Sequence, residues 1–190
     1  MAIKVTTPEF RASYVHVFHP KKNENGEDRY SISMIFSKST DITELKRAAL
    51  KVAKETWGPD VVKLIKAGRI KLPFRDGDVE REDDEAYEDS IFCNAASNRK
   101  PGVVDRKLNY IVDPEDFNSG DYARATINFF TFDRSGNKGV GVGLLNIQKL
   151  KSGERLGGGV SADRDFDAVD GGEDDFDDDD ILGAGDDIPF

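Results

Sequence analysis

Alternating apolar and polar side chains along the chain predict a series of β-strands. Residues 29–36 have the period of a strand that buries one face. Its apolar positions are Tyr30, Ile32, Met34 and Phe36. Residues 10–18 alternate in a similar way, and the polar residues 23–28 predict a turn, so we expect these two strands to form a hairpin. Further strands are predicted at residues 91–97, 103–112, 122–132 and 139–150. Turn-forming residues 133–139 predict a second hairpin between the last two strands.

One segment has the helical period instead. After Asp41, apolar residues recur three and four positions apart. These residues are Leu45, Ala48, Ala49, Val52 and Ala53. Asp41 and Glu44 resemble a capping box at the start of this helix, and Gly58-Pro59 ends it. A short second helix is predicted at 60–67, and the acidic residues 76–89 predict a long loop.

Five or six strands with a helical insertion predict a mainly β fold. An OB-fold-like barrel of five to six strands fits this pattern, and another β-barrel or a curved α+β sheet is also compatible with it. Periodicity stops after Gly157-Gly158-Gly159, and the residues from about 160 onward are rich in Gly and Asp, with little to bury. We therefore expect an OB-fold-like domain over residues 1–160 and a disordered acidic C-terminal tail over 161–190.

Composition narrows the class of protein. Hydrophobic residues make up 37% of the chain and charged residues 34%, no stretch approaches the ~18 consecutive apolar residues of a membrane span, and residues 1–4 lack the layout of a signal peptide. Cys93 is the single cysteine, which excludes a disulfide framework and a cysteine-based zinc site. A cytoplasmic protein with no membrane partner is expected.

Charge is divided unevenly between the two parts of the chain. Of 27 Lys/Arg and 37 Asp/Glu, residues 163–190 hold one and thirteen, which leaves 26 and 24 in residues 1–162. The body is therefore slightly basic although the whole chain has a net charge of −10. This asymmetry is typical of an acidic tail on a body that meets a polyanion.

The last five residues, Asp186-Asp187-Ile188-Pro189-Phe190, combine charge with an apolar end. The ring of Phe190 can enter a pocket of a partner protein while an Arg or Lys there pairs with the α-carboxylate. Ile188 adds an apolar contact, Pro189 restricts the backbone, and the aspartates steer the segment toward basic surfaces. A solubilising tail needs no apolar end, so we interpret these residues as a docking segment. The same acidic tail can also compete with nucleic acid for a basic groove.

The strand predicted at 122–132 has one face typical of a platform for unpaired bases. This face contains Tyr122, Arg124, Thr126, Asn128, Phe130 and Phe132. It mixes a cation, hydrogen-bonding groups and aromatic rings, and Arg124, Phe130 and Phe132 are the candidate contacts. The alternative is that the two phenylalanines fill the end of the barrel and that Arg124 is an ordinary surface charge. Tyr14 and Phe18 on the first strand are weaker stacking candidates.

Basic residues near this strand in the sequence are candidates for following a phosphate backbone. They are Arg99, Lys100, Arg106, Lys107, Lys149 and Lys151, with Tyr110 close by. Individually, each is more often a solvated surface side chain. As a cluster they favour a nucleic-acid interface.

Other features carry no chemistry. His16 and His19 have no third ligand nearby, and the acidic run 76–89 lacks a metal-ligand spacing. The alternating glycines 139–143 lie in a strand, so they mark a bend or the close approach of backbone or ligand and not a phosphate loop. We therefore expect no metal, no cofactor and no catalytic residues.

Two resemblances support this interpretation. The segment 186–190, with Asp175-Phe-Asp-Asp-Asp-Asp180 before it, resembles the C-terminal tip of bacterial single-stranded-DNA-binding proteins, which implies docking to replication, recombination and repair enzymes. The body resembles a family of bacteriophage single-stranded-DNA-binding proteins, which implies an OB fold and sequence-tolerant binding. The stretches that carry the second resemblance are Asn94–Asp105, Ser119–Tyr122, Ile127–Phe130, Lys138–Lys149, Gly153 and Leu156-Gly157.

The leading hypothesis is a non-enzymatic protein that coats single-stranded DNA in phage replication, recombination or repair. The alternative is an adaptor or decoy whose tail imitates that of the host protein without DNA binding by its body. A third hypothesis, a nuclease, needs metal ligands, and the spacing of Asp105, Asp113 and Asp116 does not demand one. Homo-oligomerisation remains open.

Overall fold

The structure is a computed structural model that describes residues 2–157. The strands are β1 (Ile3–Thr6), β2 (Phe10–Lys22), β3 (Asp28–Ser37), β4 (Ile70–Lys71), β5 (Arg75–Asp76), β6 (Ser90–Ser97), β7 (Gly102–Val104), β8 (Tyr122–Arg134) and β9 (Asn137–Lys151). The helices are α1 (Thr43–Trp57), α2 (Val61–Lys66) and α3 (Gly77–Glu80), with 3-10 turns η1 (Glu85–Tyr87) and η2 (Pro114–Asp116). The predicted tail, residues 161–190, lies outside the described residues.

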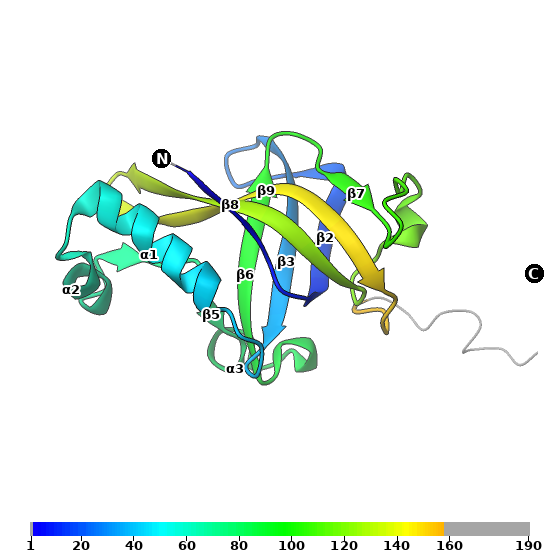
Figure 1. The fold of residues 1–190 in the computed structure, drawn as a ribbon, viewed down its shortest axis with the longest axis horizontal. Helices are drawn as coiled ribbons and strands as arrows, with labels where there is room; N and C mark the ends of the chain where they lie inside the picture. The colour runs from blue at the N-terminus through cyan, green and yellow to red at the C-terminus, as the bar shows by residue number, and fades with distance from the viewer. Residues whose placement is uncertain (1, 158–190) are drawn as a thin grey trace, which may run out of the picture. The chain divides into compact units, whose positions relative to one another are not determined.

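Five long strands pair in a ring, in the order β2, β3, β6, β9, β8 and back to β2 (Figure 1). The ring is uneven, because β8 and β9 pair along their whole length while β6 and β9 share one parallel pair, Ala96 opposite Gly143. This is a five-stranded, partly open barrel of the OB type, so the predicted mainly β, OB-fold-like class is confirmed. The sequence pattern missed the short strands β1, β4 and β5, since two to four residues are too few to show a period.

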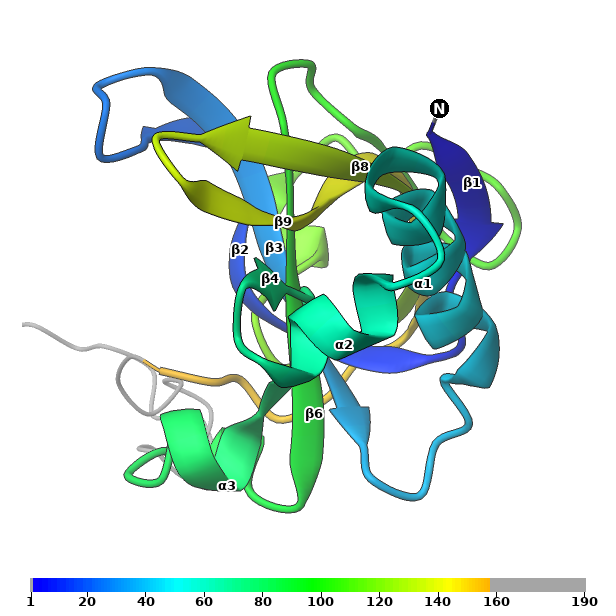
Figure 2. The same cartoon turned by 90° about the vertical axis from the view of Figure 1, so that its left-hand side faces the viewer.

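The core lies inside this ring and is closed by α1. Ile32, Met34 and Phe36 of β3 are buried as predicted, together with the apolar stripe of α1. The helix contacts β8, β9 and β1 and lies beside β1 in Figure 2, and near its C-terminal end Thr56 and Thr131 share a hydrogen bond of 2.9 Å. Asp41 lies before the helix and accepts a hydrogen bond from the backbone N–H of Thr43, but the N-cap is Ile42, one residue after the predicted cap.

The acidic segment 76–89 is more ordered than a loop. It contains α3 and η1, and its Tyr87 is fully buried against Phe92, with ring centroids 4.9 Å apart. The Tyr87 hydroxyl donates to Ser33 Oγ at 3.1 Å, and Lys38 Nζ pairs with Asp76 at 3.2 Å and also with Asp78. The segment therefore covers the outer side of β3 and β6. Within residues 2–157 no helix is long and apolar enough to cross a membrane.

Candidate nucleic-acid interface

The strand β8 separates core from surface as its alternation predicts. Ala125, Ile127 and Phe129 are buried in the barrel. The intervening side chains of Asn128, Phe130 and Phe132 point to the outer side, and neither phenylalanine belongs to the core cluster. Phe130 is 42% exposed. The alternative in which these two rings fill the end of the barrel is therefore wrong.

Each of these outer side chains lies across a glycine of β9. The register places Asn128 opposite Gly143, Phe130 opposite Gly141 and Phe132 opposite Gly139. A Cβ on Gly141 would fall 2.6 Å from the Phe130 ring, and one on Gly139 would fall 2.8 Å from the Phe132 ring. The two rings thus pack directly against the glycine backbone of β9, an arrangement known as aromatic rescue of glycine in sheets. We call Asn128, Phe130, Phe132 and these three glycines the aromatic ribbon.

Polar side chains continue the same outer face toward the other end of the hairpin. Arg124 Nε donates to Gln148 Oε1 at 2.7 Å, and Thr126 lies opposite Asn146. Tyr110 is 76% exposed and forms an isolated β-bridge with Val104 of β7. In the same strand, Gly102 pairs with Asn146 of β9. Arg124 and Tyr110 therefore share a face with the aromatic ribbon, as the sequence predicts.

Cations without an ionic partner flank this face. Lys4 of β1 lies opposite Asn128, a contact that the sequence analysis missed because β1 is so short. Arg99 and Lys100 are exposed in the link from β6 to β7. The end of this link is attached to β9, because the Gly102 N–H donates a hydrogen bond to Asn146 Oδ1 at 3.2 Å. In residues 2–157 none of the ion pairs involves these three cations.

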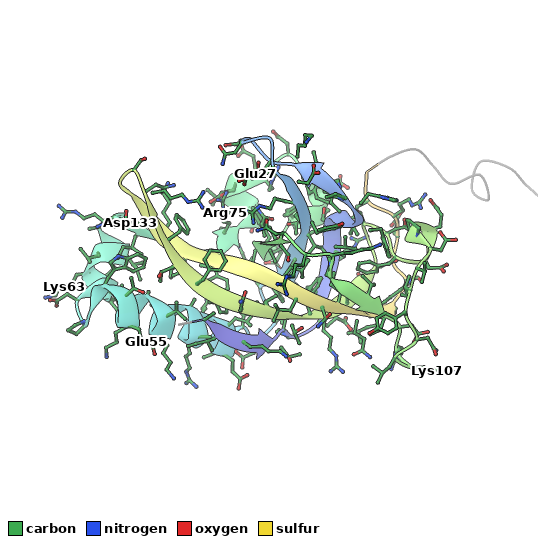
Figure 3. All side chains as sticks on the ribbon, turned by 90° about the horizontal axis from the view of Figure 1, so that it is seen from above. Glu27, Glu55, Lys63, Arg75, Lys107 and Asp133 are labelled. Carbon is green, nitrogen blue, oxygen red and sulfur yellow. The ribbon has the colours of Figure 1, made fainter. Side chains whose placement is uncertain are left out.

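The remaining predicted cations lie at the opposite end of the hairpin, as the positions of Asp133 and Lys107 in Figure 3 show. Arg106 and Lys107 are exposed there, and Arg106 Nη1 donates to the carbonyl of Leu150 at 3.4 Å. Lys151 lies 4.6 Å from the centroid of the Tyr122 ring and pairs with Glu9 at 3.6 Å.

Lys149 was predicted to contact phosphates, and the structure corrects this prediction. Its side chain is only 19% exposed, pairs with the buried Asp121 at 3.3 Å and donates to the carbonyl of Asp116 at 2.6 Å. A lysine held in this way has a structural role, because it neutralises a buried carboxylate. The basic residues that the sequence suggested as one cluster thus divide: Arg99 and Lys100 lie beside the middle of the hairpin, and the others lie at its open end.

The two aromatic candidates of β2 also separate. Phe18 is 8% exposed and belongs to the core, so it is corrected from a stacking candidate to a packing residue. Tyr14 is half exposed and has φ +45° at a bulge of β2, with the Arg81 guanidinium 5.6 Å from its ring centroid.

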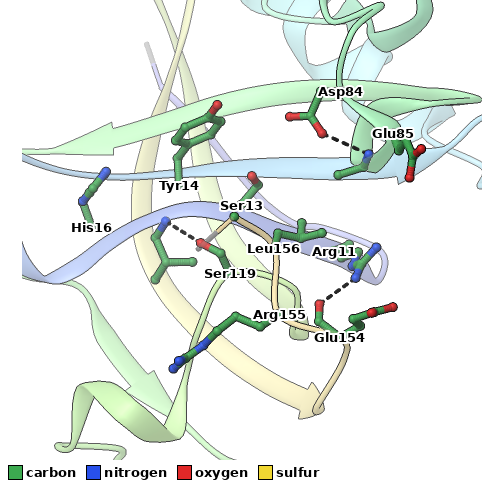
Figure 4. Close-up of a pocket in the computed structure, with 13 residues that line it drawn as sticks. Arg11, Ser13, Tyr14, His16, Asp84, Glu85, Ser119, Glu154, Arg155 and Leu156 are labelled. Atoms are coloured by element: carbon green, nitrogen blue, oxygen red, sulfur yellow. Dashed lines mark hydrogen bonds between the residues drawn. The ribbon is translucent and has the colours of Figure 1, made fainter. Parts of the chain in front are cut away.

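Tyr14 lines a hollow away from the aromatic ribbon (Figure 4). Across this hollow, Arg11 Nη2 donates to the carbonyl of Glu154 at 2.7 Å. His16 also lines it, and burial, followed by the charge of Lys21, lowers the pKa of His16. This hollow mixes cations with the acidic side chains of Asp84 and Glu85, unlike the ribbon.

An OB-type barrel with an exposed aromatic and cationic face is the construction of proteins that bind single-stranded nucleic acid. Over residues 3–181 the chain matches the model of a family described as Enterobacter phage Enc34, ssDNA-binding protein. The chain belongs to this family of phage single-stranded-DNA-binding proteins, and the resemblance seen in its sequence is confirmed.

Solved structures of phage proteins share the fold. The single-stranded DNA-binding protein from bacteriophage Enc34 in complex with ssDNA is 24% identical, with a TM-score of 0.66 over 82% of this chain and 89% of that one. A second structure of the Enc34 protein is 22% identical, with a TM-score of 0.64 over 85% and 88% of the two chains. For gp2.5 of bacteriophage T7, a single-stranded DNA binding protein, the identity is 12% and the TM-score 0.62 over 91% and 99%. A search of curated proteins found no match.

Proposed function

We propose that the protein coats unpaired DNA during phage replication, recombination or repair, with no preference for sequence and no catalysed reaction. The observation that carries this proposal is the aromatic ribbon, whose Phe130 ring is 42% exposed beside cations that have no ionic partner among residues 2–157. Such rings stack on bases with about 1–3 kcal/mol per base. Lys4, Arg99 and Lys100 then neutralise the phosphates, which releases counterions.

The construction of the ribbon explains why binding should tolerate any sequence. A ring that lies on a glycine backbone presents its face, and every base offers a π-face to stack on it. Because Phe130 and Phe132 already rest on Gly141 and Gly139, little side-chain freedom is left to lose when a base arrives. Asn128 adds hydrogen-bonding groups between the ring-bearing end and Arg124.

The tail completes the proposed function, although it lies outside the described residues. We propose that residues 161–190 recruit replication, recombination or repair proteins through Asp186, Asp187, Ile188, Pro189 and Phe190. This proposal rests on the sequence, in which thirteen carboxylates precede or flank an apolar end. The same carboxylates compete with DNA for the cations of the body, so binding should strengthen when the tail is removed.

Binding of oligo(dT) across a range of salt concentrations tests the proposal. The full chain, a chain that ends at Ala162 and a Phe130→Ala variant of each should be compared by fluorescence anisotropy. We expect the shortened chain to bind most tightly, and the Phe130→Ala change to lower affinity roughly 5- to 160-fold in both, which corresponds to the loss of one stacked base.

The same measurement separates this proposal from the adaptor or decoy. An adaptor would not bind oligo(dT) at low salt, even without its tail, and the proposed function would then be wrong. Replacement of Phe190 by Ala should leave DNA binding almost unchanged while it abolishes capture of a partner enzyme.

A further inference from the structure

A basic hollow lies at the end of the β8–β9 hairpin. Its volume is about 580 Å³, and it is lined by Gly68, Arg69, Lys71, Ser135, Gly136, Asn137 and Lys138. The lining thus contains three cations and no carboxylate. Nothing in the sequence pattern indicates this hollow, because Arg69 and Lys71 are far along the chain from the hairpin.

The hollow begins where the aromatic ribbon ends. Strand β4 pairs with β9, with Lys71 opposite Gly139 and Ile70 opposite Lys138. A Cβ on Gly139 would fall 2.8 Å from the Lys71 carbonyl oxygen and 2.8 Å from the Phe132 ring. Phe132 on β8 and Lys71 on β4 therefore lie on either side of the same strand, β9, at Gly139.

The cations of the hollow are available and are held on fixed backbone. Arg69 and Lys71 are exposed and take part in none of the ion pairs within residues 2–157. Lys138 pairs with Asp133 at 3.6 Å, but both side chains are about half exposed, so the pair is weak. Ser135 and Gly136 have φ of +52° and +80°, which is the backbone of a tight two-residue hairpin turn.

We propose that this hollow binds backbone phosphates of single-stranded DNA beyond the base that stacks on Phe132, so that the strand leaves the ribbon past the β8–β9 turn. The inference rests on the proposed function and adds to it the path that the DNA takes across the protein. Arg69 and Lys71 hold the phosphates on one side, and Lys138 exchanges its exposed pairing with Asp133 for a phosphate on the other. The aromatic ribbon then stacks bases while the hollow neutralises charge.

Affinity across salt tests the hollow against a matched control. The Arg69→Ala/Lys71→Ala variant of the full chain should have a salt dependence that is shallower by about 1.4 in log–log slope, since each lost phosphate contact on a single strand contributes about 0.7. The control is Lys46→Ala/Lys51→Ala, which removes the same charge from the exposed side of α1. If both variants have the same slope, the hollow does not contact the strand.

Position along the DNA gives a second, independent measurement. Burial raises the pKa of the Cys93 thiol to about 12, so a DNA-cleaving reagent attached through sulfur reacts with Asn137→Cys and spares Cys93. We expect cuts confined to one end of a bound oligo(dT), and no such cuts from Lys46→Cys. Cuts spread evenly along the strand, or none at all, would overturn the inference.

The two proposals fail in different ways. If the unaltered chain does not bind oligo(dT), the proposed function is wrong. If Phe130→Ala weakens binding while the Arg69/Lys71 variant matches its control in slope, and Asn137→Cys gives no localised cuts, then only the hollow is wrong.

Discussion

Two outer surfaces of the barrel contain aromatic rings next to cations, but Phe130 is exposed on one of them and Phe92 is covered on the other. On β8 and β9, Phe130 and Phe132 rest on glycine backbone and Phe130 is 42% exposed. On β3 and β6, Phe92 is 1% exposed, because the acidic segment 76–89 places Tyr87 against it. The Arg81 guanidinium lies 5.8 Å from the centroid of the Phe92 ring.

The difference shows that residue types alone do not define a base-stacking platform. What decides is whether another segment lies over the rings: within residues 2–157 none covers Phe130, whereas an acidic segment covers Phe92. The acidic segment is fixed at both ends by Lys38, which pairs with Asp76 and Asp78, and by Asp78, which accepts from the Asp89 N–H at 2.9 Å. It adds negative charge to the covered surface, and a phosphate backbone is thereby repelled from it.

The largest expected effect compares one ring from each surface. Phe92→Ala should lower the free energy of unfolding by about 3–5 kcal/mol, because a fully buried ring leaves a cavity. Phe130→Ala should lower it by less than about 1 kcal/mol, since surface changes are usually small. Urea unfolding measures both, and equal losses would mean that Phe130 is a core residue after all.

Displacing the Phe130 ring without deleting it tests the role of the glycines. Gly141→Val places a Cβ where the ring now lies, so we expect oligo(dT) affinity to fall by about 1–3 kcal/mol, the value of one stacked base. In a Phe130→Ala background the same change should have little further effect. A full additional loss in that background would show that Gly141 acts on binding independently of the ring.

A smaller effect is expected where the acidic segment is fixed. The hydrogen bond from Lys38, and then that from the Asp89 N–H, lower the pKa of Asp78. Its contribution to stability is therefore complete above the unfolded pKa of about 3.9 and is lost as the pH falls through the lower folded value. Asp78→Asn should reduce the drop in the urea midpoint between pH 7 and pH 3, and should speed amide exchange at Asp89. An unchanged pH dependence would contradict this assignment.

The smallest effect concerns charge alone. Glu82 and Asp83 are exposed in the acidic segment, so Glu82→Gln/Asp83→Asn should raise oligo(dT) affinity slightly at low salt. The gain should fade as the Debye length shrinks to about 8 Å at physiological ionic strength. The slope against salt should therefore steepen only slightly, because neither residue contacts a phosphate; a change as large as the ~0.7 of a whole phosphate contact would place the DNA on this surface.

The long elements of the fold were predictable from sequence because they repeat their pattern over many residues. β3, α1 and the β8–β9 hairpin all lie where periodicity places them, and Phe130 and Phe132 are on the predicted face. The alternating glycines predict a bend or the close approach of backbone or ligand. The Lys71 carbonyl does approach Gly139, but the other approaching groups are the side chains of Asn128, Phe130 and Phe132 from the neighbouring strand.

What could not be predicted depends on contacts between distant parts of the chain. Lys149 appeared to be a phosphate contact because nothing in its local sequence shows the buried Asp121 beside it. Phe18 was ambiguous because a ring on a strand suits either face. Lys4, Arg69 and Lys71 come close to the proposed binding face only through strand pairings of two to four residues, which have no periodic signal.

The strands β6 and β9 are joined by a single pair, Ala96 opposite Gly143, which leaves a thin seam in the ring. Arg99 and Lys100 follow on the β6 side of this seam, and the aromatic ribbon lies on the β9 side. Single-stranded DNA that contacts both sides would link β6 to β9 across this seam. Occupancy by DNA would then slow hydrogen exchange on both strands together, and DNA would serve as a structural component of the barrel that protects it.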